Sequence, residues 1–276
     1  MSCNSKLQLD IQGHRGCRGL LPENSLPAFK KAVELGVTTL ELDLAISKDK
    51  KVVVSHEPFI SRTYCLDSLG KEIPKEDDKK YNLYQMTFDE IKTFDCGTKQ
   101  HPRFPDQQHL KTYKPLLEEV IRLSDSLNSK IRYNIEIKAS PDYDNIFTPE
   151  PKEYVQLVLD LVNKFGIADR CNLQSFDIRI LNEIKKQDLN IIMALLVDGS
   201  ESIGNKLKEL DFKPEIISPT FQLLDINLVK MYQAEGFKII PWTVNEIQDM
   251  QQLMAMGVDG IITDFPDKLI VLSTSN

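Results

Sequence analysis

KKAVELGVTTLELDL, residues 30–44, holds the pattern that decides the fold of this chain. Its helical periodicity ends at Gly36, and a strand-like run of β-branched residues begins at once. A glycine just after a helix supplies the left-handed backbone that ends it, and Val, Ile and Thr favour strands. The same order recurs in MYQAEGFKIIPWTV (231–244) and in QQLMAMGVDGIITD (251–264). The pattern therefore predicts that helices and strands alternate along the chain.

Extending this pattern over the whole sequence yields eight candidate parallel strands, most of them separated by amphipathic helical segments. The strands are predicted at 9–13, 38–44, 132–137, 171–174, 191–196, 215–218, 239–242 and 260–263, and the helices at 24–35, 115–128, 152–165, 177–187, 203–210, 225–235 and 246–255. This alternation predicts an α/β fold, a (β/α)8 TIM barrel. An open doubly wound sheet is the alternative, but the GxGxxG turn that would favour it does not follow the first strand.

Two segments interrupt this regularity. VVVSH (52–56) follows the second strand after a polar turn that is too short for a parallel crossover, which predicts a β-hairpin. Residues 58–114 then form a polar insertion, and its charged part, KEIPKEDDKKY, is expected to be a solvated excursion. MTFDEIKTFDCG within it predicts one short helix ending at Gly97. His101 and His109 also lie in the insertion and are expected to be solvated.

Composition limits the classes of protein and partner. With 41% hydrophobic and 27% charged residues the chain is typical of a soluble globular protein. Residues 1–276 are expected to form one domain that contains the insertion. The net charge of -7 argues against nucleic acid or an anionic membrane surface as the main partner. No stretch approaches the roughly 18 apolar residues of a membrane-spanning helix, so stable membrane insertion is not expected.

The cysteines and the first residues lead to an expected location. Five scattered cysteines without CxxC spacing predict free thiols in a reducing compartment, rather than a disulfide framework or a zinc site. The start, MSCNSKLQLD, carries neither the charged nor the apolar region of a leader. A cytoplasmic location is therefore expected. The alternative is an exported protein or a lipoprotein whose leader was trimmed before Cys3.

Carboxylates lie inside two predicted strands, near the ends where a barrel of this type builds its active site. Glu41 and Asp43 alternate in the second strand and so share one face, and Glu136 lies near the end of the strand at 132–137. On a half-exposed strand they would simply form the wet face. Barrel strands are covered on both sides, however, so buried acids must be paired or bind a metal. All-oxygen ligands suit one divalent cation, Mg²⁺ or Ca²⁺.

Two histidines are predicted to meet these carboxylates. His14 lies between two glycines in GHRG, directly after the first strand. If Asp49 and Lys50 form a two-residue hairpin turn, facing positions sum to 99, and Asp43 lies opposite His56. The hairpin is therefore expected to bring a second histidine to the cation site.

The order of eight short motifs resembles that of the glycerophosphodiester phosphodiesterase family. The motifs are GHRG, PENS, ELDL, VVVSHE, EIK, QSF, WTVN and GVDGIITDFP, and the similarity extends from about residue 11 to residue 268. The resemblance implies a (β/α)8 barrel and an enzyme of the phosphoric diester hydrolase class. It also implies a small-molecule substrate, a glycerophosphodiester such as glycerophosphocholine or glycerophosphoethanolamine, which is hydrolysed with a metal ion to glycerol 3-phosphate and an alcohol.

The resemblance also implies roles for individual residues. They are acid–base catalysis by His14 and His56, metal binding by Glu41, Asp43 and Glu136, and contact with the phosphate by Arg15 and Lys138. Trp242, the only tryptophan, would offer an apolar wall to the glycerol carbons or belong to the packed core. Three motifs depart from the family pattern: His-Asp is His56-Glu57 here, Asn-Thr is Asn24-Ser25, and the Asp-Gly turn is Asp49-Lys50.

The residues fit this chemistry independently of the resemblance. A metal ion and two cationic side chains would offset the charge of a phosphodiester, and histidines exchange protons near neutral pH. Two other classes remain open. A phosphoinositide-type phospholipase C would show an apolar rim, whereas the insertion is polar. An inactive barrel that serves as a binding module would have no need of both histidines and all three carboxylates.

Overall fold

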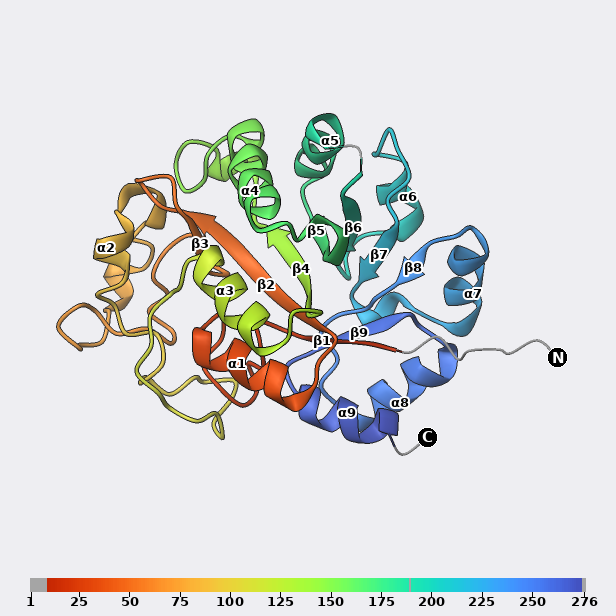
Figure 1. The fold of residues 1–276 in the computed structure, drawn as a ribbon, viewed down its shortest axis with the longest axis horizontal. Coiled ribbons are helices and arrows are strands. Elements are labelled where there is room, and N and C mark those ends of the chain that lie inside the picture. The colour runs from red at the N-terminus through yellow and green to blue at the C-terminus, as the bar shows by residue number, and fades with distance from the viewer. Residues whose placement is uncertain (1–8, 189, 275–276) are drawn as a thin grey trace.

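The computed structural model describes residues 9–188 and 190–274 and has eight parallel strands in a nearly closed barrel, with helices around it (Figure 1). Along the sheet the barrel strands are β8 (Lys238–Ile239), β7 (Ile216–Pro219), β6 (Ile192–Val197), β5 (Cys171–Ser175), β4 (Arg132–Ile137), β2 (Thr39–Ile46), β1 (Asp10–Gly13) and β9 (Gly260–Thr263). Backbone hydrogen bonds bridge the remaining seam, including Ile262 N–H to Pro241 O at 3.0 Å. The predicted TIM-barrel fold is confirmed.

The predicted helices are also found, with shifted ends. They are α1 (Leu26–Leu35), α3 (Leu117–Leu127), α4 (Pro151–Phe165), α5 (Ile178–Gln187), α6 (Ile203–Leu207), α7 (Ile226–Ala234) and α8 (Ile247–Met256). The sequence pattern did not predict α9 (Pro266–Thr274), which packs beside α1 and α8. No helix among the described residues is long and apolar enough to cross a membrane.

The opening motif folds as its pattern predicts. Ser25 caps α1 by accepting a hydrogen bond from the Ala28 N–H, and Gly36 ends the helix with a φ of 98°. The helix buries Ala28, Phe29 and Ala32 against the barrel, so its apolar face positions the following strand. Every residue of β2 is buried, including the charged ones.

The hairpin forms, but the predicted register is wrong by one residue. β3 (Val52–Val54) pairs antiparallel with β2 so that Leu44 faces Val54. The loop has one residue more than expected because Lys50 adopts a left-handed φ of 59°, and the Ser47 N–H bonds to Lys51 O at 3.0 Å. Asp43 is therefore opposite Ser55, and His56 lies just beyond the paired residues.

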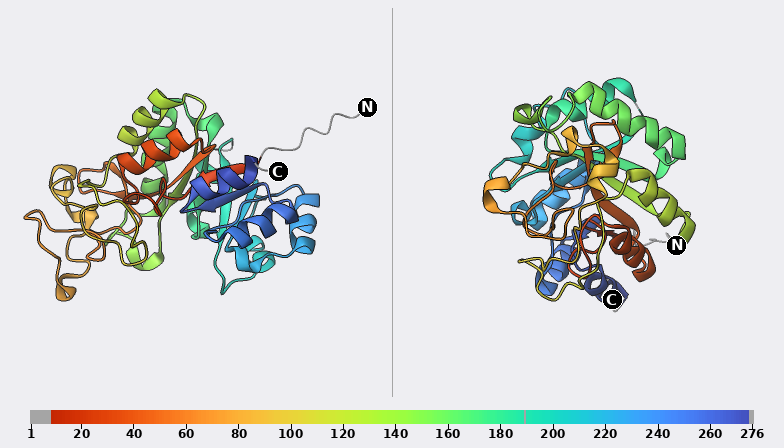
Figure 2. Two further views of the ribbon diagram at one scale, coloured as in Figure 1. Left: turned by 90° about the horizontal axis from the view of Figure 1, so that it is seen from below. Right: turned by 90° about the vertical axis from the view of Figure 1, so that its left-hand side faces the viewer.

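The insertion combines the solvated charged run predicted for it with an apolar cluster that the sequence pattern did not predict. Its charged part is largely exposed, but the segment also builds a second apolar cluster against Ala45 and Val53. The predicted short helix is α2 (Phe88–Ile91), capped by Thr87 and ending earlier than expected. Figure 2 shows the insertion on one side of the barrel, away from the two termini. The insertion therefore packs as part of the folded structure.

The prediction of free thiols throughout is wrong for two of the cysteines. Cys65 and Cys96 form a disulfide inside the insertion, where backbone pairing of Leu66 with Asp95 brings the two segments together. Cys17 and Cys171 are free and buried, and Cys3 lies outside the described residues. Spacing rules missed the bridge because its cysteines are separated by 31 positions and meet only through tertiary structure.

Reduction of this disulfide should destabilise the insertion. A loop of 31 residues predicts a loss of about 3–4 kcal/mol in unfolding free energy, because the reduced chain gains conformational entropy when unfolded. Thermal unfolding with and without a reducing agent measures the loss. In a variant carrying Cys65→Ala and Cys96→Ala the reducing agent should change nothing, and an equal shift in that variant would contradict the assignment.

Candidate active site

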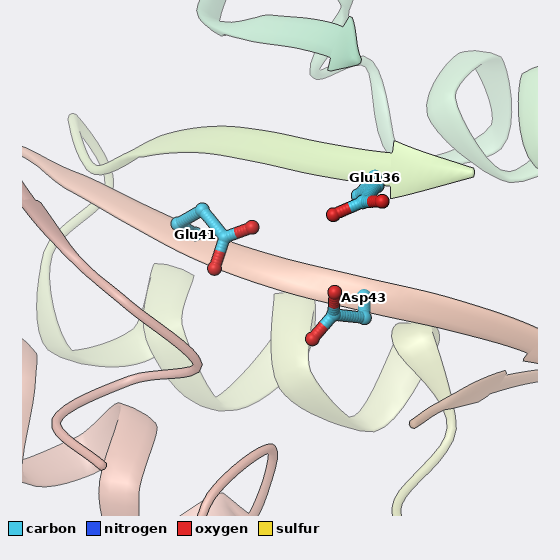
Figure 3. A group of neighbouring side chains, drawn as sticks. All are labelled: Glu41, Asp43 and Glu136. Atoms are coloured by element: carbon cyan, nitrogen blue, oxygen red, sulfur yellow. The ribbon is translucent and has the colours of Figure 1, made fainter. Parts of the chain in front are cut away.

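Three buried carboxylates meet at the carboxyl ends of two neighbouring strands. Asp43 on β2 pairs in register with Glu136 on β4, and Glu41 lies two residues earlier on the same face of β2. One oxygen from each lies within 4.8 Å of the others, and the three groups converge between the strands (Figure 3). The sheet register thus brings together all three residues predicted to bind a metal.

The electrostatics of this cluster favour a bound cation. Burial raises the pKa of Glu41 well above its usual range, and the neighbouring Asp43 and Glu136 raise it further. Burial also raises the pKa of Glu136, although Lys138 opposes it. Asp43 Oδ1 accepts no hydrogen bond from the described residues. Excess negative charge, a buried oxygen without a hydrogen bond and an all-carboxylate donor set fit a hard divalent cation.

Two cationic side chains flank the carboxylates. Arg15 Nη1 lies 2.6 Å from Glu23 Oε1, and its Nε lies 3.1 Å from Asp43 Oδ2. Lys138 Nζ lies 2.8 Å from Glu136 Oε1 and 3.4 Å from Asp43 Oδ1. Burial opposes ionisation of Asp43, but Arg15 and Lys138 hold its pKa well below its usual range. The cations predicted to contact phosphate therefore also stabilise the acidic cluster.

The two glycines around His14 and Arg15 are required by a tight turn. A Cβ on Gly13 would lie 2.2 Å from Gly16 O, so no larger residue fits there. Arg15 adopts a left-handed φ of 50°, and its backbone N–H donates to Glu41 Oε2 at 3.1 Å. The turn consequently directs the backbone N–H of Arg15 to Glu41 and its side chain to Glu23 and Asp43.

His14 is held by a carboxylate that the sequence analysis did not assign. Its Nδ1 lies 2.7 Å from Asp264 Oδ1, and its Nε2 lies 3.8 Å from Glu41 Oε2. Asp264 also accepts two hydrogen bonds from Arg18 and one from Asn245. Burial lowers the pKa of His14 to about 4, against the opposing charge of Asp264. A neutral His14 then donates from Nδ1 and keeps Nε2 as an acceptor.

His56 reaches the same pocket from the end of the hairpin. Its Nδ1 lies 3.0 Å from Glu57 Oε1, so the glutamate holds the imidazole although it replaces an aspartate of the family pattern. The two histidines line one cavity of about 460 Å³. The other predicted site residues that line it are Arg15, Glu41, Glu136, Lys138 and Trp242.

Trp242 forms part of the pocket wall and is also anchored to the barrel. Its Nε1–H donates to Ser218 O at 2.8 Å, and its ring lies edge-on against Phe176 at 5.5 Å between centroids. Both rings line the cavity and are half-buried. The two interpretations of this residue, apolar wall and packing, are therefore compatible.

Further polar residues complete the site, and two of them were available in the PENS motif. Glu23 pairs with Arg15, and Asn24 Nδ2 donates to Asp43 Oδ2 at 2.9 Å. His101 is buried, with Nε2 3.6 Å from Glu23 Oε2, so the expectation that it is solvated is wrong. Asp264, likewise, lies in the quoted GVDGIITDFP motif. Glu23, Asn24 and Asp264 were present in quoted motifs, but the sequence analysis assigned them no role in the site.

Comparison with known proteins identifies what this barrel is similar to. The sequence model of the Glycerophosphoryl diester phosphodiesterase family matches residues 14–268. The uncharacterized protein YqiK of Bacillus subtilis is 31% identical over 266 residues, which cover 95% of this chain and 97% of YqiK. A glycerophosphodiester phosphodiesterase of Caldanaerobacter subterraneus is 29% identical over 262 residues, which cover 95% of this chain and 96% of that protein.

Two solved structures resemble this one over nearly its whole length. A putative glycerophosphoryl diester phosphodiesterase from Silicibacter pomeroyi has a TM-score of 0.87 at 27% identity, covering 97% of this chain and 93% of that one. A phosphodiesterase from Oleispira antarctica, solved in complex with the product sn-glycerol-3-phosphate, has a TM-score of 0.77 at 21% identity. That match covers 97% of both chains.

Asp264→Asn should weaken both stability and catalysis. The amide cannot replace a carboxylate that neutralises Arg18, and breaking a buried pair of this kind costs about 3 kcal/mol or more. The amide also keeps only one acceptor oxygen, and an amide nitrogen facing Nδ1 would favour the wrong tautomer of His14, so kcat should fall at least about 100-fold. Thermal unfolding and steady-state kinetics measure the two effects. Asp211→Asn, at an exposed position, is the control and should change neither.

Proposed function

Because the chain belongs to the glycerophosphoryl diester phosphodiesterase family, we propose that it hydrolyses soluble glycerophosphodiesters, such as glycerophosphocholine, with one divalent cation and two histidines. Membership makes it a phosphoric diester hydrolase. The observation that supports the finer proposal is one pocket lined by His14 and His56 together with Glu41 and Glu136 of the acidic cluster. The products are glycerol 3-phosphate and an alcohol.

Glu41, Asp43 and Glu136 would hold the cation, Mg²⁺ or Ca²⁺. When bound, it would offset the negative charge that develops on the phosphoryl oxygens. Arg15 and Lys138, which already lie against the acidic cluster, would hold the phosphate in place and add further positive charge there.

The histidines are suited to move protons on opposite sides of the reaction. His14 is oriented by Asp264 and His56 by Glu57, in both cases through Nδ1. Each Nε2 is therefore left for the substrate. One histidine takes a proton from the attacking hydroxyl while the other donates a proton to the leaving oxygen.

The nucleophile is proposed to come from the substrate. Ser175 Oγ donates to Ile137 O, and Cys17 Sγ donates to Ala28 O, so both nearby candidates are engaged. Burial also raises the pKa of the Cys17 thiol to about 12. The 2-hydroxyl of the glycerol attacks phosphorus, and the alcohol departs from the cyclic phosphate that forms. Water then opens that ring with the histidine roles exchanged, which regenerates the starting protonation states.

An exported location is proposed in place of the cytoplasmic one. The Cys65–Cys96 disulfide supports it, because disulfides persist in oxidising compartments and are rare in the cytosol. Fractionating the cells that naturally make the protein tests this location, and recovery in the cytoplasmic fraction alone would contradict it.

Turnover of glycerophosphocholine should require the divalent cation. Activity towards this substrate should be abolished by EDTA and restored by Mg²⁺ or Ca²⁺, whereas a phospholipid should be a poor substrate. Glu136→Gln keeps the side-chain shape but removes a ligand charge, so kcat/KM should fall about 100-fold or more. Calorimetric titration with the metal alone should show weaker binding.

Glu153→Gln is the matched control, since it removes one charge from an exposed position on α4. It should leave activity and metal binding unchanged. Full activity of Glu136→Gln in the presence of EDTA would end the metal proposal. Preference for the phospholipid would instead favour a phospholipase.

The two histidines should behave as one catalytic unit. The pH profile of kcat/KM is expected to be a bell whose limbs belong to the pair. His14→Ala and His56→Ala should each lose most of the activity, and the double variant should lose little more. Losses that multiply in the double variant would contradict a shared step.

A substrate that lacks the neighbouring hydroxyl should bind but react poorly. The 2-deoxy analogue of glycerophosphocholine cannot form the cyclic phosphate, so its kcat should fall by several orders of magnitude, on the scale of about 10⁵ for a well-placed intramolecular group. Single-turnover kinetics with both substrates measures this difference. Equal turnover would point to direct attack by water.

A further inference from the structure

Both carboxylate oxygens of Glu57 have side-chain partners. Oε1 lies 3.0 Å from His56 Nδ1, and Oε2 accepts a hydrogen bond from the Tyr64 hydroxyl at 2.6 Å. Glu57 and His56 belong to the end of the hairpin, whereas Tyr64 belongs to the insertion, where it is buried. The insertion therefore reaches the carboxylate that orients a proposed catalytic histidine.

The Tyr64 hydroxyl has a fixed direction because a second buried group lies behind it. Lys114 Nζ, at the far end of the insertion, lies 3.3 Å from the Tyr64 oxygen. An ammonium can only donate, so the hydroxyl accepts from Lys114 and gives its own proton to Glu57. Burial would raise the pKa of Glu57, but the His56 bond and the Lys114 charge together bring it to about 2. Glu57 stays an ionised acceptor over the working range of pH.

The ring of Tyr64 is also fixed by its packing. His101 stacks on it with 5.6 Å between ring centroids and an angle of 19° between planes. The next residue, Cys65, is tied to Cys96 by the disulfide, and the Leu66 N–H bonds to Asp95 O at 2.7 Å. The backbone beside Tyr64 is thus fixed on the insertion's own apolar cluster.

We propose that Tyr64, supported by Lys114, is a positioning residue for His56, and this inference rests on the proposed function of the histidine pair. Glutamate has one more rotatable bond than aspartate, so contact with the imidazole alone would leave Glu57 several conformations. The second hydrogen bond, from Tyr64, selects one of them. Glu57 then holds the Nδ1–H tautomer of His56, and Nε2 stays available for proton transfer.

Tyr64→Phe tests this role by removing one oxygen atom. We expect kcat for glycerophosphocholine to fall about 10- to 100-fold with little change in KM, since ground-state binding does not use Tyr64. Tyr113→Phe is the matched control. It belongs to the same insertion, and its hydroxyl also donates to a carboxylate, Glu119 Oε1, at 2.9 Å, but that carboxylate caps α3 through the Leu116 N–H and has no histidine partner among the described residues. It should keep wild-type kinetics.

A double-variant cycle shows whether Tyr64 acts through Glu57. Tyr64→Phe should have no further effect on kcat in a Glu57→Ala background. Multiplying losses would overturn the proposal. Loss of activity in His56→Ala with wild-type kcat in Tyr64→Phe would also overturn it, while leaving the proposed function intact. Full activity of His56→Ala would instead overturn the proposed function.

Nitrogen NMR of the histidine rings provides a readout that needs no activity. In the wild-type protein His56 should be the Nδ1–H tautomer, and His56→Ala identifies its signals. Tyr64→Phe should raise the share of the Nε2–H tautomer, whereas Tyr113→Phe should not. A wild-type His56 found as the Nε2–H tautomer would overturn the proposal even if Tyr64→Phe failed to fold.

Discussion

Burial of three carboxylates at the ends of two adjacent strands is the constraint on which the site depends. Removing a charge from water costs several kcal/mol even after the protein relaxes, and here like charges are packed together as well. Polar and cationic side chains around the cluster offset much of this energetic cost. Arg15 and Lys138 bring positive charge, while Gln174 Nε2 and Asn24 Nδ2 each donate a hydrogen bond at 2.9 Å. The remaining negative charge makes a cation the natural partner.

The alternation of side chains along strands explains why much of this site could be predicted. Side chains alternate between the two faces of a strand, so Glu41 and Asp43 share one face of β2. The parallel register with β4 then brings Glu136 beside them. The same parity argument erred in the hairpin. In the hairpin the predicted register depended on the length of the loop. The loop has one residue more than expected, and Lys50 within it has a left-handed backbone. A local pattern predicts faces well, but predicts registers only where turns are regular.

The contacts that could not be predicted are those between distant segments without periodicity. Asp264 and His14 are 250 residues apart in the chain and meet because β1 and β9 are neighbours in the barrel. The structure of the insertion is harder still to predict from sequence. Its charged run dominates the sequence pattern, whereas an apolar cluster and a disulfide stabilise its fold. The charged run is exposed, as expected, but its charge says nothing about the apolar residues elsewhere in the insertion. Cys65 and Cys96 come close enough to form a disulfide only once the insertion has folded, so their pairing could not be predicted from spacing.

The two histidines are held in physically different ways: the barrel positions His14, whereas the insertion helps to position His56. Asp264 is fully buried at a strand end, and Arg18 and Asn245 complete its contacts, so His14 is fixed by the barrel. Glu57 remains partly exposed and takes its second contact from Tyr64 in a loop segment. Loops tolerate change better than barrel strands do. A change confined to Tyr64 can therefore alter the holding of His56 without removing the contact of Asp264 with His14.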